Sequence, residues 1–159
     1  AITSLIRQTS MKVLICPEDM TQIKLGKKFV YDRLPKEVQK RVVWKSEYWL
    51  TDEALSTYLQ SAGLFGLEQH SPIMCIGNGI PALLGRFREQ TTKGFMWKDI
   101  GLSDWYFDSD SKFDMDRLTA AVLELANDPQ GCIERAKKAQ NYVNSLNQKC
   151  VGQVRRNIT

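Results

Sequence analysis

The sequence predicts an α/β protein, a Rossmann-like three-layer domain in which helices cover both faces of a parallel sheet of about five strands. Short runs of apolar and β-branched residues alternate along the chain with longer segments whose apolar residues recur at helical spacing. The chain has 159 residues, of which 43% are hydrophobic and 25% charged, as expected for one globular domain. We therefore expect a single domain over residues 1–159.

Five segments have the length and apolar character of strands, and turn-forming or charged residues follow each of them. These segments are residues 11–16, 41–45, 63–67, 81–86 and 105–108. Helical segments separate them, and a helix between two strands returns the chain to the same end of the sheet. The strands are therefore expected to be parallel, with the third and fourth as neighbours because the helix between them is short.

The remaining segments are expected to be helical. Ile2, Leu5 and Ile6 predict a short helix before the first strand. The other expected helices are residues 18–34, a helix that opens at 51–53, residues 71–77, residues 92–100, a helix that Asp114 caps, and residues 130–156. The last helix has one apolar face, and it is long enough to extend beyond its own domain.

The net charge of +4 comes from scattered lysines and arginines and not from one basic stripe. Pairs such as Lys27-Lys28 and Lys137-Lys138 have the character of solvated helix faces, so no nucleic-acid partner is expected. A mild positive field does suit an anionic small-molecule substrate. No apolar run approaches the roughly 18 residues of a membrane span, and no charged leader opens the chain. We expect a cytoplasmic protein with no integral membrane segment.

The cysteines lie too far apart for a C-x-x-C metal or redox motif, so reduced thiols are expected. They are Cys16, Cys75, Cys132 and Cys150. One histidine and scattered carboxylates match no metal-ligand spacing. We expect neither a metal nor a cofactor.

The only histidine, His70, stands between the third strand and the helix that follows it. Ser71 and Pro72 have the pattern of an N-cap followed by proline in the first turn, which leaves backbone N–H groups free to bind phosphate or carboxylate. An imidazole beside them can donate a hydrogen bond or a proton to the same anion. The structural alternative is that this histidine only caps a loop.

Ligands of open parallel sheets bind at the carboxyl ends of the strands, and the loops there are polar in this chain. Glu18 and Asp19 follow the first strand, and Ser46 and Glu47 follow the second. The loops after the third and fourth strands are expected to form one pocket. Its candidate residues are Glu68, His70, Ser71, Arg88, Glu89, Gln90, Thr91 and Lys93.

The expected roles in this pocket follow from side-chain chemistry. His70 would act as an acid or hydrogen-bond donor, and Glu68 or Glu89 would take a proton or hold a sugar hydroxyl. Lys93 would neutralise an anionic donor. The other donor-binding residues would be Ser71, Arg88, Gln90 and Thr91. Each of these residues, taken separately, also has an ordinary interpretation as a surface polar group.

A series of short motifs follows in order along the middle of the chain. They are Gly66, His70-Ser71, Gly79-Ile80-Pro81, residues 82–84, Lys93-Gly94-Phe95 and Asp99-Ile100-Gly101-Leu102. This series resembles the C-terminal domain of the polysaccharide pyruvyl transferases, which is similar to the second domain of GT-B glycosyltransferases. The resemblance implies a domain that binds an anionic donor through His70 and transfers a pyruvyl or glycosyl group to a saccharide in polysaccharide biosynthesis.

Glu68 departs from the family pattern, which has an arginine two residues before the histidine. The reversed charge disfavours phosphoenolpyruvate as the donor, although phosphoenolpyruvate and a sugar nucleotide both stay candidate donors. It could mark a subgroup whose donor is a sugar nucleotide, or one whose chemistry has changed. Glu68 could also pair with Lys93 or Arg88, or serve as a base.

The resemblance further implies that the chain is the C-terminal, donor-binding half of a larger two-domain protein, whose N-terminal domain would hold the acceptor. Two other functions stay open. One is a non-catalytic module that binds a nucleotide or a sugar, and the other is a structural domain that binds a partner through its last helix and its aromatic residues. Those aromatic residues are Trp44, Tyr48, Trp49, Trp97 and Trp105.

Overall fold

The computed structural model describes residues 1–158 and contains two small parallel sheets. In one sheet, β1 (Val13–Ile15) pairs with β2 (Val42–Trp44). In the other, β4 (Ala82–Arg86) lies between β3 (Leu64–Gly66) and β5 (Tyr106–Asp108). The α/β class, the parallel direction of the strands and the pairing of the third with the fourth are confirmed. The single five-stranded sheet is wrong, because within residues 1–158 no ladder joins the two sheets.

The two sheets are separate because each has its own buried cluster. Ile6, Val38 and Val42 form the small cluster beside β1 and β2, and a much larger cluster surrounds β3, β4 and β5. Side-chain packing connects the two parts: α1 (Ile2–Gln8) lies against α7 (Lys112–Asn127), and Leu5 packs on the large cluster. An apolar run therefore identified each strand, whereas helix packing determined which strands became neighbours.

Most helices lie in the segments where the sequence predicted them, with changed bounds. They are α2 (Met20–Leu25), the π-helical η1 (Gly26–Val30), the 3₁₀ turn η2 (Tyr31–Arg33), α3 (Lys36–Gln39), α4 (Thr51–Leu59), α5 (His70–Gly77), the 3₁₀ turns η3 (Arg88–Gln90) and η4 (Ser103–Trp105), α6 (Met96–Asp99) and α8 (Pro129–Ile158). Among these, α3, η3 and η4 were not predicted, and the helix expected over 18–34 is divided into three pieces. Asp19 caps its first piece by accepting the backbone N–H groups of Thr21 and Gln22.

Three expected helix starts are corrected. The N-cap of α5 is Gln69, so Ser71 is not the cap but lies within the first turn. The N-cap of α7 is Ser111, whose hydroxyl accepts the backbone N–H of Asp114 at 3.3 Å. The helix expected over 92–100 is reduced to α6, because Gly94 has a φ of 87°, which a right-handed helix does not allow.

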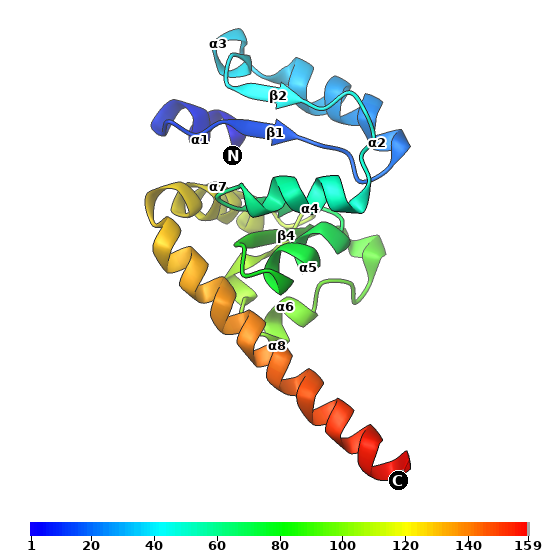
Figure 1. Ribbon diagram of the computed structural model, residues 1–159. Coiled ribbons are helices and arrows are strands. Elements are labelled where there is room, and N and C mark those ends of the chain that lie inside the picture. The colour runs from blue at the N-terminus through cyan, green and yellow to red at the C-terminus, as the bar shows by residue number, and fades with distance from the viewer. Residues whose placement is uncertain (159) are drawn as a thin grey trace.

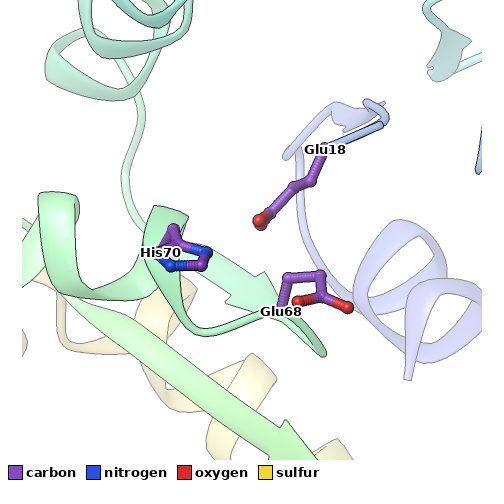
Figure 2. Close-up of side chains that lie close together, drawn as sticks. All are labelled: Glu18, Glu68 and His70. Atoms are coloured by element: carbon purple, nitrogen blue, oxygen red, sulfur yellow. The ribbon is translucent and has the colours of Figure 1, made fainter. Parts of the chain in front are cut away.

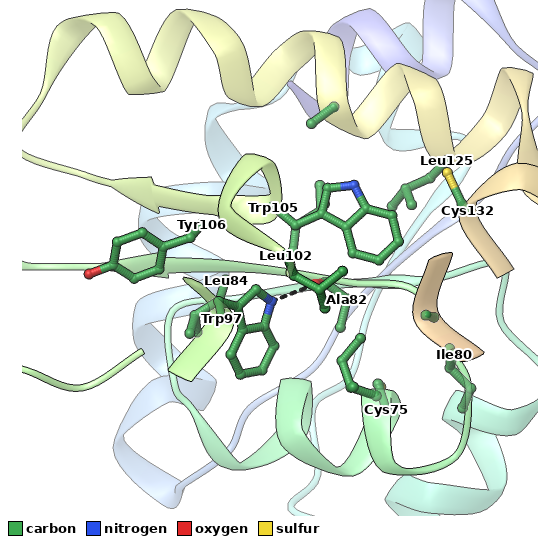
Figure 3. Packing of buried hydrophobic residues seen from close by; sticks show 14 of the residues in the cluster. Cys75, Ile80, Ala82, Leu84, Trp97, Leu102, Trp105, Tyr106, Leu125 and Cys132 are labelled. Atoms are coloured by element: carbon green, nitrogen blue, oxygen red, sulfur yellow. Dashed lines mark hydrogen bonds between the residues drawn. The ribbon is translucent and has the colours of Figure 1, made fainter. Parts of the chain in front are cut away.

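The large core lies around the three-stranded sheet, with α5 and α7 on opposite sides of the strands (Figure 3). Leu64 lies opposite Ala82 in the ladder between β3 and β4. Trp97 inserts its indole beneath β4 and donates its ring N–H to the carbonyl of Ala82 at 3.1 Å. Trp49 and Trp105 are buried as well, so they are core residues and not part of an aromatic contact surface.

The last helix, α8, packs on the domain only through its first half. Cys132, Ala136 and Ala139 are its buried residues, and Gln140 donates its side-chain amide to the carbonyl of Gly77 at 2.6 Å. Figure 1 shows the C-terminal half leaving the body of the molecule. The expectation that this helix outruns its domain is confirmed. No helix in the described part of the chain has both the length and the apolar character needed to cross a membrane.

Candidate functional site

Three titratable side chains meet at the carboxyl ends of β1 and β3. Glu18 comes from the loop after β1, whereas Glu68 and His70 come from the turn between β3 and α5. Their ligand atoms, two carboxylate oxygens and one imidazole nitrogen, all lie within 4.8 Å of one another (Figure 2). The place agrees with the rule that open parallel sheets bind ligands at the carboxyl ends of their strands.

A cavity of about 150 Å³ opens beside this cluster. Glu18, His70, Ser71 and Met74 form one side of it. The other side comes from α4 and the loop before it, namely Tyr48, Trp49, Leu50, Thr51, Ala54 and Tyr58. Aromatic rings, hydroxyls and a carboxylate therefore face the same space, which is the mixed lining typical of small-molecule sites.

The carboxylate of Glu18 lies at the start of α5. Burial raises its pKa, and the negative charge of Glu68 raises it further. Hydrogen bonds from the hydroxyl and the backbone N–H of Ser71, together with the nearby His70, oppose that rise. The helix start that the sequence assigned to an external anion is therefore engaged by a carboxylate of the chain itself.

A buried hydroxyl pair supports the position of Glu18 from behind. Tyr58, on α4, donates its phenolic O–H to the Ser71 hydroxyl oxygen at 2.9 Å, and both residues are buried. Burial raises the pKa of Tyr58 to about 12, so this O–H stays protonated at neutral pH. The hydroxyl pair of Tyr58 and Ser71 thus lies beside the Glu18 carboxylate, whose pKa Ser71 helps to lower.

One positive side chain lies beside the cavity. Lys45, which follows β2, places its ammonium group 5.2 Å from the centre of the Trp49 ring. In the described part of the chain, neither Glu18 nor Glu68 forms an ion pair with a lysine or an arginine. Among residues 1–158 the two carboxylates are therefore close together without a lysine or arginine partner.

The predicted donor-binding residues after β4 lie in a different place. Gln90 and Lys93 line a shallow depression with Gln69 and Gly94, and none of these residues lines the cavity. Gln90 accepts the backbone N–H of Phe87 and donates to the carbonyl of Leu67 at 3.2 Å. The loops after β3 and β4 do adjoin as predicted, but Gln90 serves to join them.

The other residues of that loop are exposed. Arg88 donates its backbone N–H to Asp110 at 2.8 Å, and Glu89 lies on the surface of η3. Thr91 has a positive φ of 53°, and its carbonyl accepts a hydrogen bond from the guanidinium of Arg86. The structure thus divides the predicted site: Glu68, His70 and Ser71 come together, and the five residues after β4 form a separate group.

Sequence analysis placed Glu18 in a polar loop but did not assign it to the pocket. It also did not predict that Tyr48, Thr51 and Tyr58, in and before α4, would line the same cavity as His70. The position of Glu18 directly after a strand is typical of a ligand-binding residue. Assigning it to the pocket of His70 also requires knowing that β1 ends close to β3. The sequence of α4 indicated a binding site even less clearly, because hydroxyl and aromatic residues at helical spacing are equally typical of a helix that packs on a core.

Backbone geometry explains why three positions of the motif series are glycine. Gly79, Gly94 and Gly101 all have positive φ angles, between 71° and 87°, which favour glycine over any other residue. A Cβ on Gly94 would also lie 2.8 Å from side-chain atoms of Leu84 and Tyr106. These positions of the motif series are explained by turns of the fold and not by chemistry.

Comparisons with models of known protein families, with curated proteins and with solved structures find no match to this chain. The resemblance to the pyruvyl transferases therefore stays a prediction from its motif residues. The function has to be argued from the geometry of the cavity and the three side chains beside it.

Proposed function

We propose that this chain is the donor-binding half of a transferase that moves a glycosyl or pyruvyl group from an anionic donor to a hydroxyl of a saccharide. The observation that carries the proposal is that Glu18, Glu68 and His70 lie together, with ligand atoms within 4.8 Å of one another, beside a cavity near the carboxyl ends of β1 and β3. Acid–base groups and a small-molecule cavity are together at the place where such folds bind ligands.

A sugar nucleotide suits this site better than phosphoenolpyruvate does. Two carboxylates beside His70 repel a small anion whose charge is concentrated on a phosphate and a carboxylate. A sugar ring is uncharged, and its hydroxyls donate hydrogen bonds to carboxylates. Lys45, at the wall formed by Trp49, is placed to attract the phosphates of the same donor.

The size of the cavity is consistent with one sugar ring. At about 150 Å³ it is smaller than the roughly 300 Å³ at which sites for drug-sized ligands begin. The nucleotide would therefore lie outside it, along the open edge of the strands. Tyr48, which is 46% exposed, presents an aromatic ring against which the apolar face of a sugar can pack.

The proposed step needs one base. The oxygen of the acceptor hydroxyl forms a bond to the anomeric carbon of the donor, and the bond from that carbon to the phosphate oxygen breaks. The electron pair of the broken bond leaves with the nucleoside diphosphate. The hydroxyl proton passes to Glu68 or His70, which lie within reach of one another, and general base catalysis of this kind contributes about 10² to 10⁴ in rate.

A second candidate function, a sugar- or nucleotide-binding module without catalysis, is favoured by one observation. The Glu18 carboxylate lies beside Ser71 at the start of α5, where a phosphate of the donor would otherwise bind. The two candidates differ in turnover: both predict binding at the cavity, and only the transferase predicts transfer of labelled sugar to a saccharide.

Calorimetric titration of the full chain with a panel of sugar nucleotides and with phosphoenolpyruvate tests the proposal. We expect one class of sugar nucleotide to bind, at least tenfold more weakly in Glu68→Gln and in Lys45→Gln, and equally well in the control Glu134→Gln on α8. Tight binding of phosphoenolpyruvate would contradict the proposal. So would sugar-nucleotide binding that is unchanged in Glu68→Gln and lost in Lys93→Ala. The second of these outcomes would place the ligand in the depression after β4.

A further inference from the structure

We infer that Glu18, Glu68 and His70 bind one divalent metal ion of the Mn²⁺ or Zn²⁺ class. This site goes beyond the proposed function, and it differs from the expectation that the chain has no metal. Sequence spacing could not indicate it, because Glu18 is far from the other two residues along the chain and only the fold brings the three together.

The positions of the ligand atoms are close to those that a metal requires. Bonds of about 2.1 Å from carboxylate oxygen and imidazole nitrogen to one ion put two ligand atoms at most about 4.2 Å apart. The three atoms here lie within 4.8 Å of one another. A small rotation of the side chains, which are half-buried or exposed, is enough to close the set around an ion.

The type and charge of the ligands select the ion. Carboxylates suit Mn²⁺ and Mg²⁺, whereas imidazole suits Zn²⁺ and other transition ions, so a set with both favours Mn²⁺ or Zn²⁺. With a neutral imidazole the set carries two negative charges. No lysine or arginine of residues 1–158 pairs with either carboxylate, so a divalent ion would supply the missing positive charge.

Neighbouring groups hold one ligand in place, as they do around established metal ligands. Ser71 lies beside the carboxylate of Glu18 and lowers its pKa, and Tyr58 donates its O–H to Ser71 at 2.9 Å. Tyr58 and Ser71 come from α4 and α5, which are packed against each other. Glu18 thus has a fixed polar neighbour on the side of α5.

The ion would keep open coordination positions. Three protein ligands are fewer than the four of a structural zinc site, and the cavity lies beside them. Water, or an oxygen of a bound ligand, can complete the shell from that side. If the ligand is the sugar nucleotide proposed above, its phosphates would be the oxygens that complete the shell, and in that ion-bound form a water on the ion would take the proton in place of Glu68 or His70. This role alone rests on the proposed function.

Binding of Mn²⁺ alone to the full chain, without any sugar nucleotide, tests the site. Electron paramagnetic resonance counts the free ion, and the NMR signal of the imidazole reports contact directly because the chain has one histidine. We expect one Mn²⁺ per chain and broadening of the His70 signal at substoichiometric Mn²⁺. Affinity should fall at least tenfold in Glu18→Gln and in Glu68→Gln and stay unchanged in Glu134→Gln.

Two results would overturn the inference: no saturable binding of Mn²⁺ or Zn²⁺ up to millimolar concentration, or binding that leaves the His70 signal unaffected. Circular dichroism of each variant shows whether it is folded, and the wild-type titration decides the question even if one variant is not. Because no donor and no turnover are involved, a negative result would leave the proposed transferase untouched. Loss of donor binding would equally leave the metal site untouched.

Discussion

At the scale of single residues, the site depends on one carboxylate that comes from a different part of the chain. Glu68 and His70 are neighbours in sequence, so a local pattern was enough to single them out. Glu18 joins them only because β1 and β3 end close together, and the hydroxyl pair of Ser71 and Tyr58 lies beside it. Local chemistry could be predicted from the sequence, and the third member required the tertiary structure.

The buried hydroxyl pair should be measurable in stability. Tyr58→Phe removes the donor to Ser71 and leaves the ring in place, so we expect the free energy of unfolding to fall by about 1 kcal/mol. Urea denaturation measures the change. Tyr142→Phe on the exposed surface of α8 is the matched control and should have no effect. Equal stability of Tyr58→Phe and wild type would show that this hydrogen bond contributes nothing.

The four thiols should differ in reactivity. All are free, but burial raises the pKa of Cys75 to about 12 and that of Cys132 to about 11. At pH 8 the thiolate fractions are then about 10⁻⁴ and 10⁻³, and the sulfur atoms are shielded as well. Exposed Cys150 should react first with a thiol reagent in the native protein. Cys150→Ser should remove the fast phase, and a fast phase that persists in Cys150→Ser and also after Cys16→Ser would contradict the packing of α5 or α8.

At the scale of elements, strands and helices could be located from the sequence but not paired. Apolar runs placed all five strands, and the interval from Ser71 to Gly77 correctly indicated a short helix between neighbours. The sequence did not show that Ile6, Val38 and Val42 would form a separate cluster and keep β1 and β2 apart from the larger sheet. Such pairing depends on contacts between distant segments, which a local pattern does not contain.

Gly94 offers a test of the turn between β4 and α6. Residue 94 has a positive φ, and the Cβ added by Gly94→Ala would lie close to Leu84 and Tyr106. We therefore expect the free energy of unfolding to fall by about 2 to 4 kcal/mol. Gly101→Ala has a similar φ and no atom within 4 Å of the added carbon, so it should lose only about 1 kcal/mol. Thermal unfolding compares the two. Equal losses would mean that backbone strain alone requires glycine at residue 94.

At the scale of the whole molecule, the body of the domain and the second half of α8 are energetically distinct. The large cluster includes Cys132, Ala136 and Ala139, and no later residue of α8 within the described chain is fully buried. The contact between Gln140 and Gly77 marks the limit of the packed part. The sequence predicted that this helix outruns its domain but not where the packed part ends, because its apolar face continues through Leu146 and Val154, which are exposed.

Removal of residues 145–158 should therefore change the free energy of unfolding by less than about 1 kcal/mol, since little apolar area leaves the core. Ending the chain at residue 131 should prevent folding, because it deletes all three buried residues of the helix. Urea denaturation of both truncated forms measures this. A large loss from the shorter deletion would show that the overhang packs against the domain or a second molecule, and dependence on protein concentration would separate these two cases.

The most direct test of the account is the imidazole NMR signal of the single histidine, followed while the full chain is titrated with sugar nucleotides and phosphoenolpyruvate. The titration is carried out first with a chelator, which removes metal ions, and then with Zn²⁺, which is diamagnetic and does not broaden the signal. The account predicts that one class of sugar nucleotide shifts the His70 signal in a saturable way and that Glu68→Gln suppresses the shift. An unchanged signal with every donor, under both metal conditions, would contradict a ligand site at the carboxyl ends of β1 and β3.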